Sequence, residues 1–331
     1  MRGIKVGQGW TAGRGAQLIG WLLAYAIVAL IAAAARRRKT GCGLFLLLLA
    51  LGGALCWSRC AAGDLRVATF NIRNFRPEKT DVARLVTLLE ELDADVIAVQ
   101  EIEDPAGFKD VVGRIRAPGR RYALALSRCG GRSAMHVGFV YDAARIELRG
   151  QQEYPELDPG GGGDCRGERS GLLGQFAESE VPFELLVVHL VATGDEERAA
   201  RRRAQWDLAL AIVARRRAEG AGAIAILGDT NSTGYMDDRW GERTFITRRL
   251  RETGLELPTS QLGCSAYWRP EPDTLAPSLL DHVVVTPGFP ASGAAEVRGF
   301  CAEVACRGLP GDSPPPDYMK VSDHCPVVLG R

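Results

Sequence analysis

The sequence predicts an α/β domain that follows an apolar, basic segment, and three observations support this expectation. Along residues 64–331, short apolar runs of β type alternate with segments of helical spacing. Residues 1–63 hold eight of the 41 Lys and Arg residues and none of the 40 Asp and Glu residues, so residues 64–331 carry a net charge of −7. The second part is also long enough to bury a full core. We therefore expect a basic head, residues 1–63, and a mildly acidic α/β domain, residues 64–331.

The basic head is expected to lie in a membrane. Residues 18–35 are uncharged and apolar over a length close to the roughly 20 residues that cross a bilayer. A basic cluster follows at 36–39, and residues 43–57 form a second, shorter apolar run, which fits either a second span or the core of a secretory signal. Basic clusters tend to stay in the cytoplasm, so both interpretations place the following domain outside it. We expect a cell-membrane protein whose α/β domain is extracytoplasmic.

The cysteines of the α/β domain agree with export. Residues 64–331 contain six cysteines, an even number, and no Cys-x-x-Cys pair that would indicate a zinc site. In an oxidising compartment such cysteines form disulfides, so we predict at least one disulfide among the six. Their spacing leaves the pairing open, and Cys325 is the member that could instead be a packed free thiol.

The expected elements follow from apolar spacing along the domain. Thr80 can cap a helix whose apolar positions extend from Val82 to Leu92. A longer helix is predicted at 196–217, and its arginine runs are better explained as a solvated face than as a phosphate-binding patch. The predicted strands are 65–71, 95–100, 137–141, 183–190, 223–227, 280–286 and 325–329.

Polar side chains interrupt or end these strands. A polar group is costly to bury unless it is paired. For any single residue a turn cap is the simpler explanation, and His282 is best explained in that way. Taken together, however, the polar residues at the ends of strands of one sheet predict one convergent cleft. These polar residues are Asn71, Glu101, His189, Asp229, Asn231, Asp281, Asp323 and His324.

Short segments around these residues resemble, in the same order, motifs of the endonuclease/exonuclease/phosphatase superfamily, whose members include deoxyribonuclease I and bacterial sphingomyelinases. The resemblance covers essentially all of residues 64–331. It implies a four-layered α/β sandwich, with two packed mixed β-sheets flanked by helices. It also implies hydrolysis of a phosphate ester with Mg²⁺, or alternatively Mn²⁺ or Ca²⁺, as cofactor. The matching segments are 67–73, 95–101, 188–190, 228–231, 280–282 and 322–326.

The resemblance implies a metal and phosphate site of oxygen ligands, which suit a hard divalent cation. Glu101 would be the principal metal ligand, with Asn71 and Asp323 beside it. Asp229 would orient and deprotonate the attacking water, while Asn231 would form a hydrogen bond to the phosphate.

The resemblance also gives the histidines a role in charge stabilisation or proton transfer. His324, held by Asp281, and His189 would act in this way, and Arg169 would bind substrate or support the cleft. Deoxyribonuclease I has a glutamate before the middle strand that orients the first histidine, whereas residues 133–136 here contain no carboxylate. We therefore expect His189 to lack that partner.

The leading functional expectation is a membrane-anchored nuclease. A phospholipid-headgroup phosphodiesterase of sphingomyelinase type, a phosphomonoesterase and an inactive binding scaffold are the alternatives. The net negative charge of residues 64–331 argues against binding of a polyanion by overall charge alone. A bound metal could supply the missing positive charge. The expected partners are a phosphate-ester substrate, in particular nucleic acid, and the membrane; no protein partner is predicted.

Overall fold

The computed structural model describes residues 65–158, 167 and 169–330. The predicted membrane segments, 18–35 and 43–57, lie outside these residues. Within the described part of the chain, no helix is both long and apolar enough to cross a membrane.

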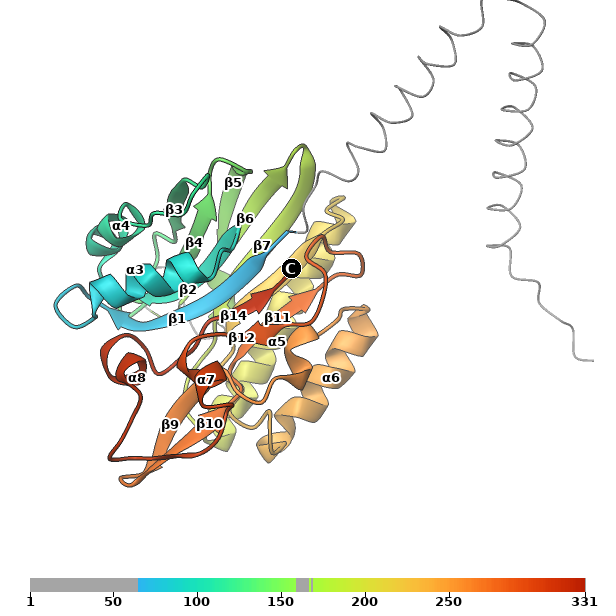
Figure 1. Ribbon diagram of the computed structural model, residues 1–331. Coiled ribbons are helices and arrows are strands. Elements are labelled where there is room, and N and C mark those ends of the chain that lie inside the picture. The colour runs from blue at the N-terminus through green and yellow to red at the C-terminus, as the bar shows by residue number, and fades with distance from the viewer. Residues whose placement is uncertain (1–64, 159–166, 168, 331) are drawn as a thin grey trace, which may run out of the picture. The chain divides into compact units, whose positions relative to one another are not determined.

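Two large mixed β-sheets form the centre of the domain (Figure 1). Each contains one parallel pair, β1 with β2 and β7 with β8, among antiparallel neighbours. The first sheet has the order β12 (Glu296–Val297), β14 (Val327–Leu329), β1 (Val67–Phe75), β2 (Val96–Ile102), β4 (His136–Asp142) and β3 (Tyr122–Leu126). The second has the order β11 (Asp281–Val285), β8 (Ile224–Asp229), β7 (Val181–His189), β6 (Gly171–Glu178) and β5 (Ile146–Tyr154).

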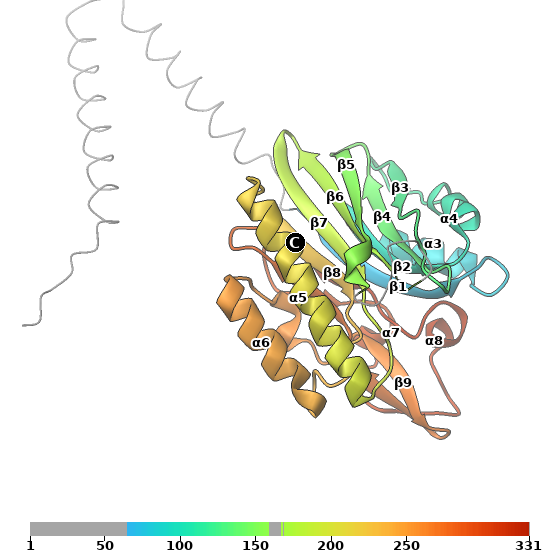
Figure 2. The same cartoon turned by 180° about the vertical axis from the view of Figure 1, so that it is seen from behind.

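The alternation of side chains along the strands produces three apolar layers. The middle layer lies between the two sheets and includes Phe139 and Phe176. Helices α3 (Val82–Glu91) and α4 (Pro105–Val112) cover the outer face of the first sheet. Helices α5 (Glu196–Ala218) and α6 (Glu242–Thr253) cover the outer face of the second sheet (Figure 2). The predicted α/β class is therefore confirmed.

The C-terminal part of the domain is built from shorter elements. A small third sheet joins β9 (Ala266–Glu271), β10 (Thr274–Ser278) and β13 (Leu309–Pro310). Helices α7 (Phe300–Glu303) and α8 (Pro316–Lys320) have only four and five residues. Single helical turns of 3₁₀ type complete the described elements, at η1 (Pro155–Leu157), η2 (Arg239–Gly241) and η3 (Pro258–Gln261).

Two disulfides hold this C-terminal part together. Cys264 is bonded to Cys306, and Cys301 is bonded to Cys325. The prediction of at least one disulfide is confirmed, whereas the suggestion that Cys325 is a free thiol is wrong. The reason is local packing, since Cys301 of α7 and Cys325 lie in the same small buried cluster.

Two local expectations are also corrected. Asp81, rather than Thr80, caps α3, because its side chain accepts a hydrogen bond from Arg84 N at 3.1 Å. Thr80 instead closes the preceding turn through a bond from its backbone N to Arg76 O. On α5, Arg202 does not lie on a solvated face: it is fully buried and forms an ion pair with Glu242 of α6.

All seven predicted strands are present, with shifted ends. The expectation that the polar strand ends belong to one sheet is wrong, because β1 and β2 belong to the first sheet and β7, β8 and β11 to the second.

Candidate active site

The register of the second sheet brings three of the predicted site residues into one row. His189, the last residue of β7, pairs with Asp229, the last residue of β8, and Asp229 pairs with Asp281, the first residue of β11. Two residues away on each strand, Val187, Leu227 and Val283 lie in the apolar layer between the sheets. Because side chains repeat with a period of two, the polar row occupies one end of that layer. The cleft therefore begins where the middle core ends.

The first sheet contributes Asn71 and Glu101 to the same point. Glu101 has a left-handed backbone, φ 62°, at a bulge where the β2 register shifts between Val99 and Ile102. A bulge redirects a side chain, and here it turns the Glu101 carboxylate towards Asn71. Asn71 Nδ2 lies 2.9 Å from Glu101 Oε1 and 2.8 Å from Asp229 Oδ2, so this amide bridges the two sheets.

The turn after β8 fixes the carboxylate of Asp229. Gly228 has φ 142°, and a Cβ atom there would lie only 2.0 Å from Val188 O, so the close approach of β7 and β8 requires glycine. Asn231 is also left-handed, φ 48°, and its backbone N donates to Asp229 Oδ1 at 2.9 Å. Its Nδ2 donates to Asp229 Oδ2 and to Leu190 O. Asn231 therefore orients Asp229.

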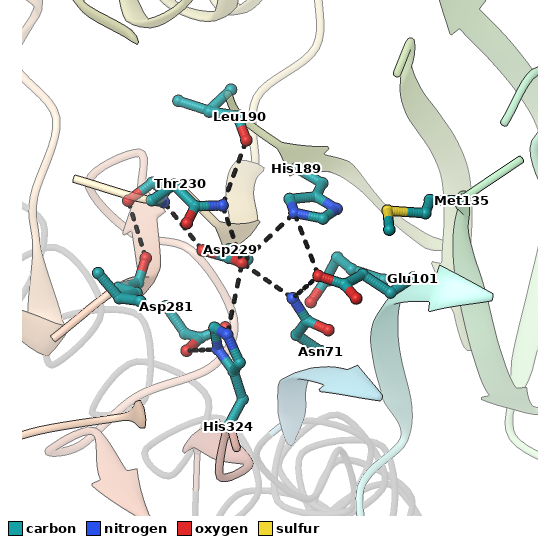
Figure 3. A network of polar contacts seen from close by, with 12 residues as sticks. Asn71, Glu101, Met135, His189, Leu190, Asp229, Thr230, Asp281 and His324 are labelled. Carbon is teal, nitrogen blue, oxygen red and sulfur yellow. Dashed lines mark hydrogen bonds and ion pairs between the residues drawn. The ribbon is translucent and has the colours of Figure 1, made fainter. Parts of the chain in front are cut away.

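A buried carboxylate holds the catalytic candidate His324. Its Nδ1 lies 2.8 Å from Asp281 Oδ2, while its Nε2 faces the cleft, 3.7 Å from Asp229 Oδ2 (Figure 3). Burial lowers the pKa of His324, but the charges of Asp281 and Asp229 outweigh it and raise the pKa well above the usual value. The predicted pairing of His324 with Asp281 is present in the structure.

His189 has a different environment from His324. Its Nε2 lies 3.6 Å from Glu101 Oε1 and 3.5 Å from Asp229 Oδ2, but its buried Nδ1 has no hydrogen-bond partner among the described residues. Burial lowers the pKa of His189 well below the usual value, and Arg169 adds to the effect. The segment 133–136, which has no carboxylate, contributes Met135, whose Sδ lies 3.6 Å from Arg169 Nη1.

Arg169 braces the end of β7. Its guanidinium donates to His189 O at 3.3 Å and to Leu190 O at 3.0 Å, and it contacts Met135 Sδ at 3.6 Å. The structure therefore brings Arg169 to the cleft as a support for the His189 backbone.

The donor set fits a divalent cation. One ligand atom each from Glu101, His189 and Asp229 lie within 4.8 Å of one another, and Asp229, Asp281 and His324 form a second such group. Burial raises the pKa of Asp229 to about 7, and the negative charges of Asp281 and Glu101 contribute to the rise. Carboxylates crowded in this way are stabilised by a nearby positive charge.

The remaining predicted residues lie at the margin of this arrangement. Asp323 belongs to neither of the two donor groups found in the described residues, and its Oδ1 is buried 4.0 Å from Arg73 Nε. His282 points to the opposite face of β11, as alternation requires, and its Nδ1 lies 3.0 Å from Thr259 Oγ1. Burial lowers the pKa of His282 to about 4.

Two serines in the site were not identified from the sequence. Ser265 Oγ donates to Asp281 Oδ2 at 2.8 Å and accepts hydrogen bonds from two backbone N atoms, those of Leu280 and Asp281. Ser322 Oγ donates to Asn71 O at 2.7 Å and accepts from His324 N at 3.0 Å. Ser322 lies within the motif segment 322–326, whereas no pattern in the sequence marks Ser265.

The two-sheet α/β core thus carries carboxylates and imidazoles at one end of the inter-sheet layer. The chain belongs to the endonuclease/exonuclease/phosphatase family of hydrolytic phosphoesterases, whose model matches residues 68–324. No curated protein matches the chain by sequence.

Solved structures share the fold at low sequence identity. TDP2 of D. rerio, complexed with a single-strand DNA product, has a TM-score of 0.55 at 16% identity, over 80% of this chain and 98% of that one. The human Nocturnin catalytic domain with bound sulfate has a TM-score of 0.54 at 15% identity, over 80% of this chain and 93% of that one. A mannosyl-6-phosphatase of Bacteroides thetaiotaomicron has a TM-score of 0.52 at 16% identity, over 80% of this chain and 98% of that one.

Proposed function

We propose that this protein is a divalent-metal-dependent phosphodiesterase that cleaves nucleic acid outside the cytoplasm and is anchored to the membrane through residues 1–63. The observation that carries the proposal is the convergence of Glu101, His189, Asp229 and the Asp281–His324 pair on one point of the cleft. A binding scaffold would not need two buried imidazoles aimed at the same buried carboxylate.

The residues of the cleft divide the chemistry among them. Glu101 would hold Mg²⁺, with Asp229 and His189 as further donors; when bound, the ion neutralises charge on the phosphoryl oxygens. Asn71 and Asn231 hold the Asp229 carboxylate by hydrogen bonds, so that it can orient the attacking water and accept its proton.

His324 acts beside Asp229, with its Nε2 3.7 Å from Asp229 Oδ2. Because Nδ1 is bonded to Asp281, the ring is fixed with Nε2 towards the cleft, where it can donate a hydrogen bond to the developing negative charge. Asp281 thus plays an orienting role, since it contacts the imidazole and not the cleft.

The choice of nucleic acid over a lipid headgroup is supported by fold similarity. One solved structure with this fold is complexed with a single-strand DNA product.

The experiment that tests the proposal is a substrate panel with the full chain. Supercoiled DNA, single-strand DNA, RNA, sphingomyelin vesicles and a sugar phosphate monoester are each incubated with Mg²⁺ and with EDTA. We expect Mg²⁺-dependent cleavage of a nucleic acid. Preferential release of a lipid headgroup or of inorganic phosphate would assign the site to an alternative class, and inactivity on every substrate would leave only the binding scaffold.

A matched variant tests the metal assignment. Glu101→Gln keeps the shape of the side chain and removes its charge, so the Mg²⁺ concentration for half-maximal activity should rise at least about tenfold. Excess Mg²⁺ should restore part of the rate. An unchanged Mg²⁺ requirement would contradict the role of Glu101.

The location of the domain is tested separately. A reporter enzyme that works only outside the cytoplasm, fused after Arg331, should be active. An inactive fusion, with activity instead of a second reporter that works only in the cytoplasm, would contradict the proposed topology. Amino-terminal sequencing of the mature protein then distinguishes a cleaved signal at 43–57 from a second span.

A further inference from the structure

The Asp281–His324 pair is linked to both disulfides of the C-terminal part through neighbouring residues. Cys325 directly follows His324, and Cys264 directly precedes Ser265, whose hydroxyl is bonded to Asp281. Each disulfide therefore includes a cysteine that is adjacent in sequence either to His324 or to Ser265, and both of these residues bond to Asp281.

The two linked backbones also contact each other. Cys325 N donates to Ser265 O at 2.7 Å, and Ala266 forms an isolated β-bridge with His324. The segment that carries Ser265, directly before β9, and the segment that carries His324 thus lie side by side. A shift of either backbone therefore changes the distance from the imidazole to Asp281.

Both disulfides end on one short segment, residues 301–306. Cys301 lies in α7, which has only four residues, and Cys306 follows it in a left-handed turn, φ 51°. A helix of one turn is not stable by itself. Its packing is limited to a small buried cluster, in which the Phe300 ring contacts the rings of Tyr267 and Tyr318. The covalent bonds therefore supply order that regular structure does not.

We propose that the Cys264–Cys306 and Cys301–Cys325 disulfides, together with Ser265, are positioning elements of the Asp281–His324 pair, so that full turnover requires both bonds. The inference rests on the proposed hydrolytic role of His324. A catalytic group displaced by about 1 Å can cost ~10²-fold in rate, and a cross-link limits such displacement.

The experiment compares two double variants of the full chain, Cys301→Ser with Cys325→Ser and Cys264→Ser with Cys306→Ser. Each should lower kcat by ~10-fold to ~10²-fold and change KM by less than about twofold, because substrate and metal contacts remain. Ser265→Ala, which keeps both disulfides, should lower kcat in the same way. Ser260→Ala, an exposed serine in η3, is the matched control and should keep wild-type kcat.

A second measurement separates positioning from general stabilisation. In a His324→Ala background, loss of either disulfide should cause no further decrease in kcat, because the disulfides act through His324. An equal fold-loss in both backgrounds would overturn the proposal, as would wild-type kcat in both double variants. If a serine variant does not fold, Cys301→Ala with Cys325→Val restores apolar volume at that disulfide and is measured instead.

An activity-independent readout keeps this inference distinct from the proposed function. The chain has four histidines, so the hydrogen-bonded Nδ1 proton of His324 can be followed by NMR of the ¹⁵N-histidine-labelled protein. We expect its signal in the wild type and its loss in folded disulfide variants. Inactivity of the wild type on every substrate would refute the proposed function, while an unchanged signal in the variants would refute the positioning role.

Discussion

The two halves of the cleft are held by different kinds of interaction. Asn71, Glu101, His189 and Asp229 lie on long strands, and the register of two large sheets sets their positions. His324 lies among elements of two to six residues, which two disulfides tie together. Backbone pairing positions the side chains of one half, whereas covalent links position those of the other. The disulfides of the second half persist in an oxidising environment.

The largest effect is expected in the half that the sheets hold. Asp229→Asn keeps the shape of the side chain but removes the proton acceptor, so kcat should fall by up to ~10⁴-fold. The fold should remain, because the amide oxygen can still accept one of the hydrogen bonds that Asn71 and Asn231 donate. Steady-state kinetics together with circular dichroism check both points. Wild-type turnover in the folded variant would exclude Asp229 as the base.

The sheet-held half is also expected to depend on a buried ion pair. Arg202 is fully buried, bonds both carboxylate oxygens of Glu242, and donates to Thr193 O and to Thr233 Oγ1. It thereby joins the loops that follow β7 and β8. Arg202→Met leaves Glu242 as an unpaired buried charge and should lower the free energy of unfolding by about 3–5 kcal/mol.

Arg217→Met is the matched control for Arg202, since it removes an exposed arginine from the same helix. Its effect on unfolding by urea should be within about 0.5 kcal/mol. If the two variants unfold at the same urea concentration, the ion pair does not stabilise this half.

A smaller loss is expected in the disulfide-held half. His324→Ala removes the imidazole that faces the cleft, and kcat should fall ~10²-fold. This value is near the lower end of the rate contribution of proton-transfer groups, ~10²-fold to ~10⁴-fold. His282→Ala should keep most of the activity, because His282 faces the outer layer and contacts Thr259. Loss of activity in a folded His282→Ala variant, with wild-type activity in His324→Ala, would reverse the assignment.

The sequence predicted the sheet-held half of the cleft better than the disulfide-held half. The alternating segment 65–71 and the apolar run 183–190 indicate strands directly, and a polar residue in each, Asn71 or His189, is visible. Strand β5 was missed because residues 146–154 expose alternate polar side chains and contain few apolar ones. Strands β9 and β10 were missed because prolines and charged residues interrupt them.

The contacts that hold His324 could not be predicted for a different reason. Ser265 and Asp281 are 16 residues apart, and Cys301 and Cys325 are 24 apart, so their proximity depends on the fold of short elements with no periodicity. The burial of Arg202 could not be predicted from the sequence either, because its partner Glu242 lies 40 residues away. Local patterns identify residue types at strand ends, whereas long-range pairs need the tertiary structure.

The smallest predicted effect concerns the contact between the two halves. Ser322 Oγ donates to Asn71 O of β1 and accepts from His324 N, so one buried hydroxyl joins the sheet-held half to the disulfide-held half. Ser322→Ala leaves both partners without this bond and should lower the free energy of unfolding by about 1–2 kcal/mol. Hydrogen exchange should then quicken at the amide of His324, while β2 and β8 keep their protection, because the sheets do not depend on this serine. Equal loss of protection across both halves would mean that the two halves unfold as one unit and are not held separately.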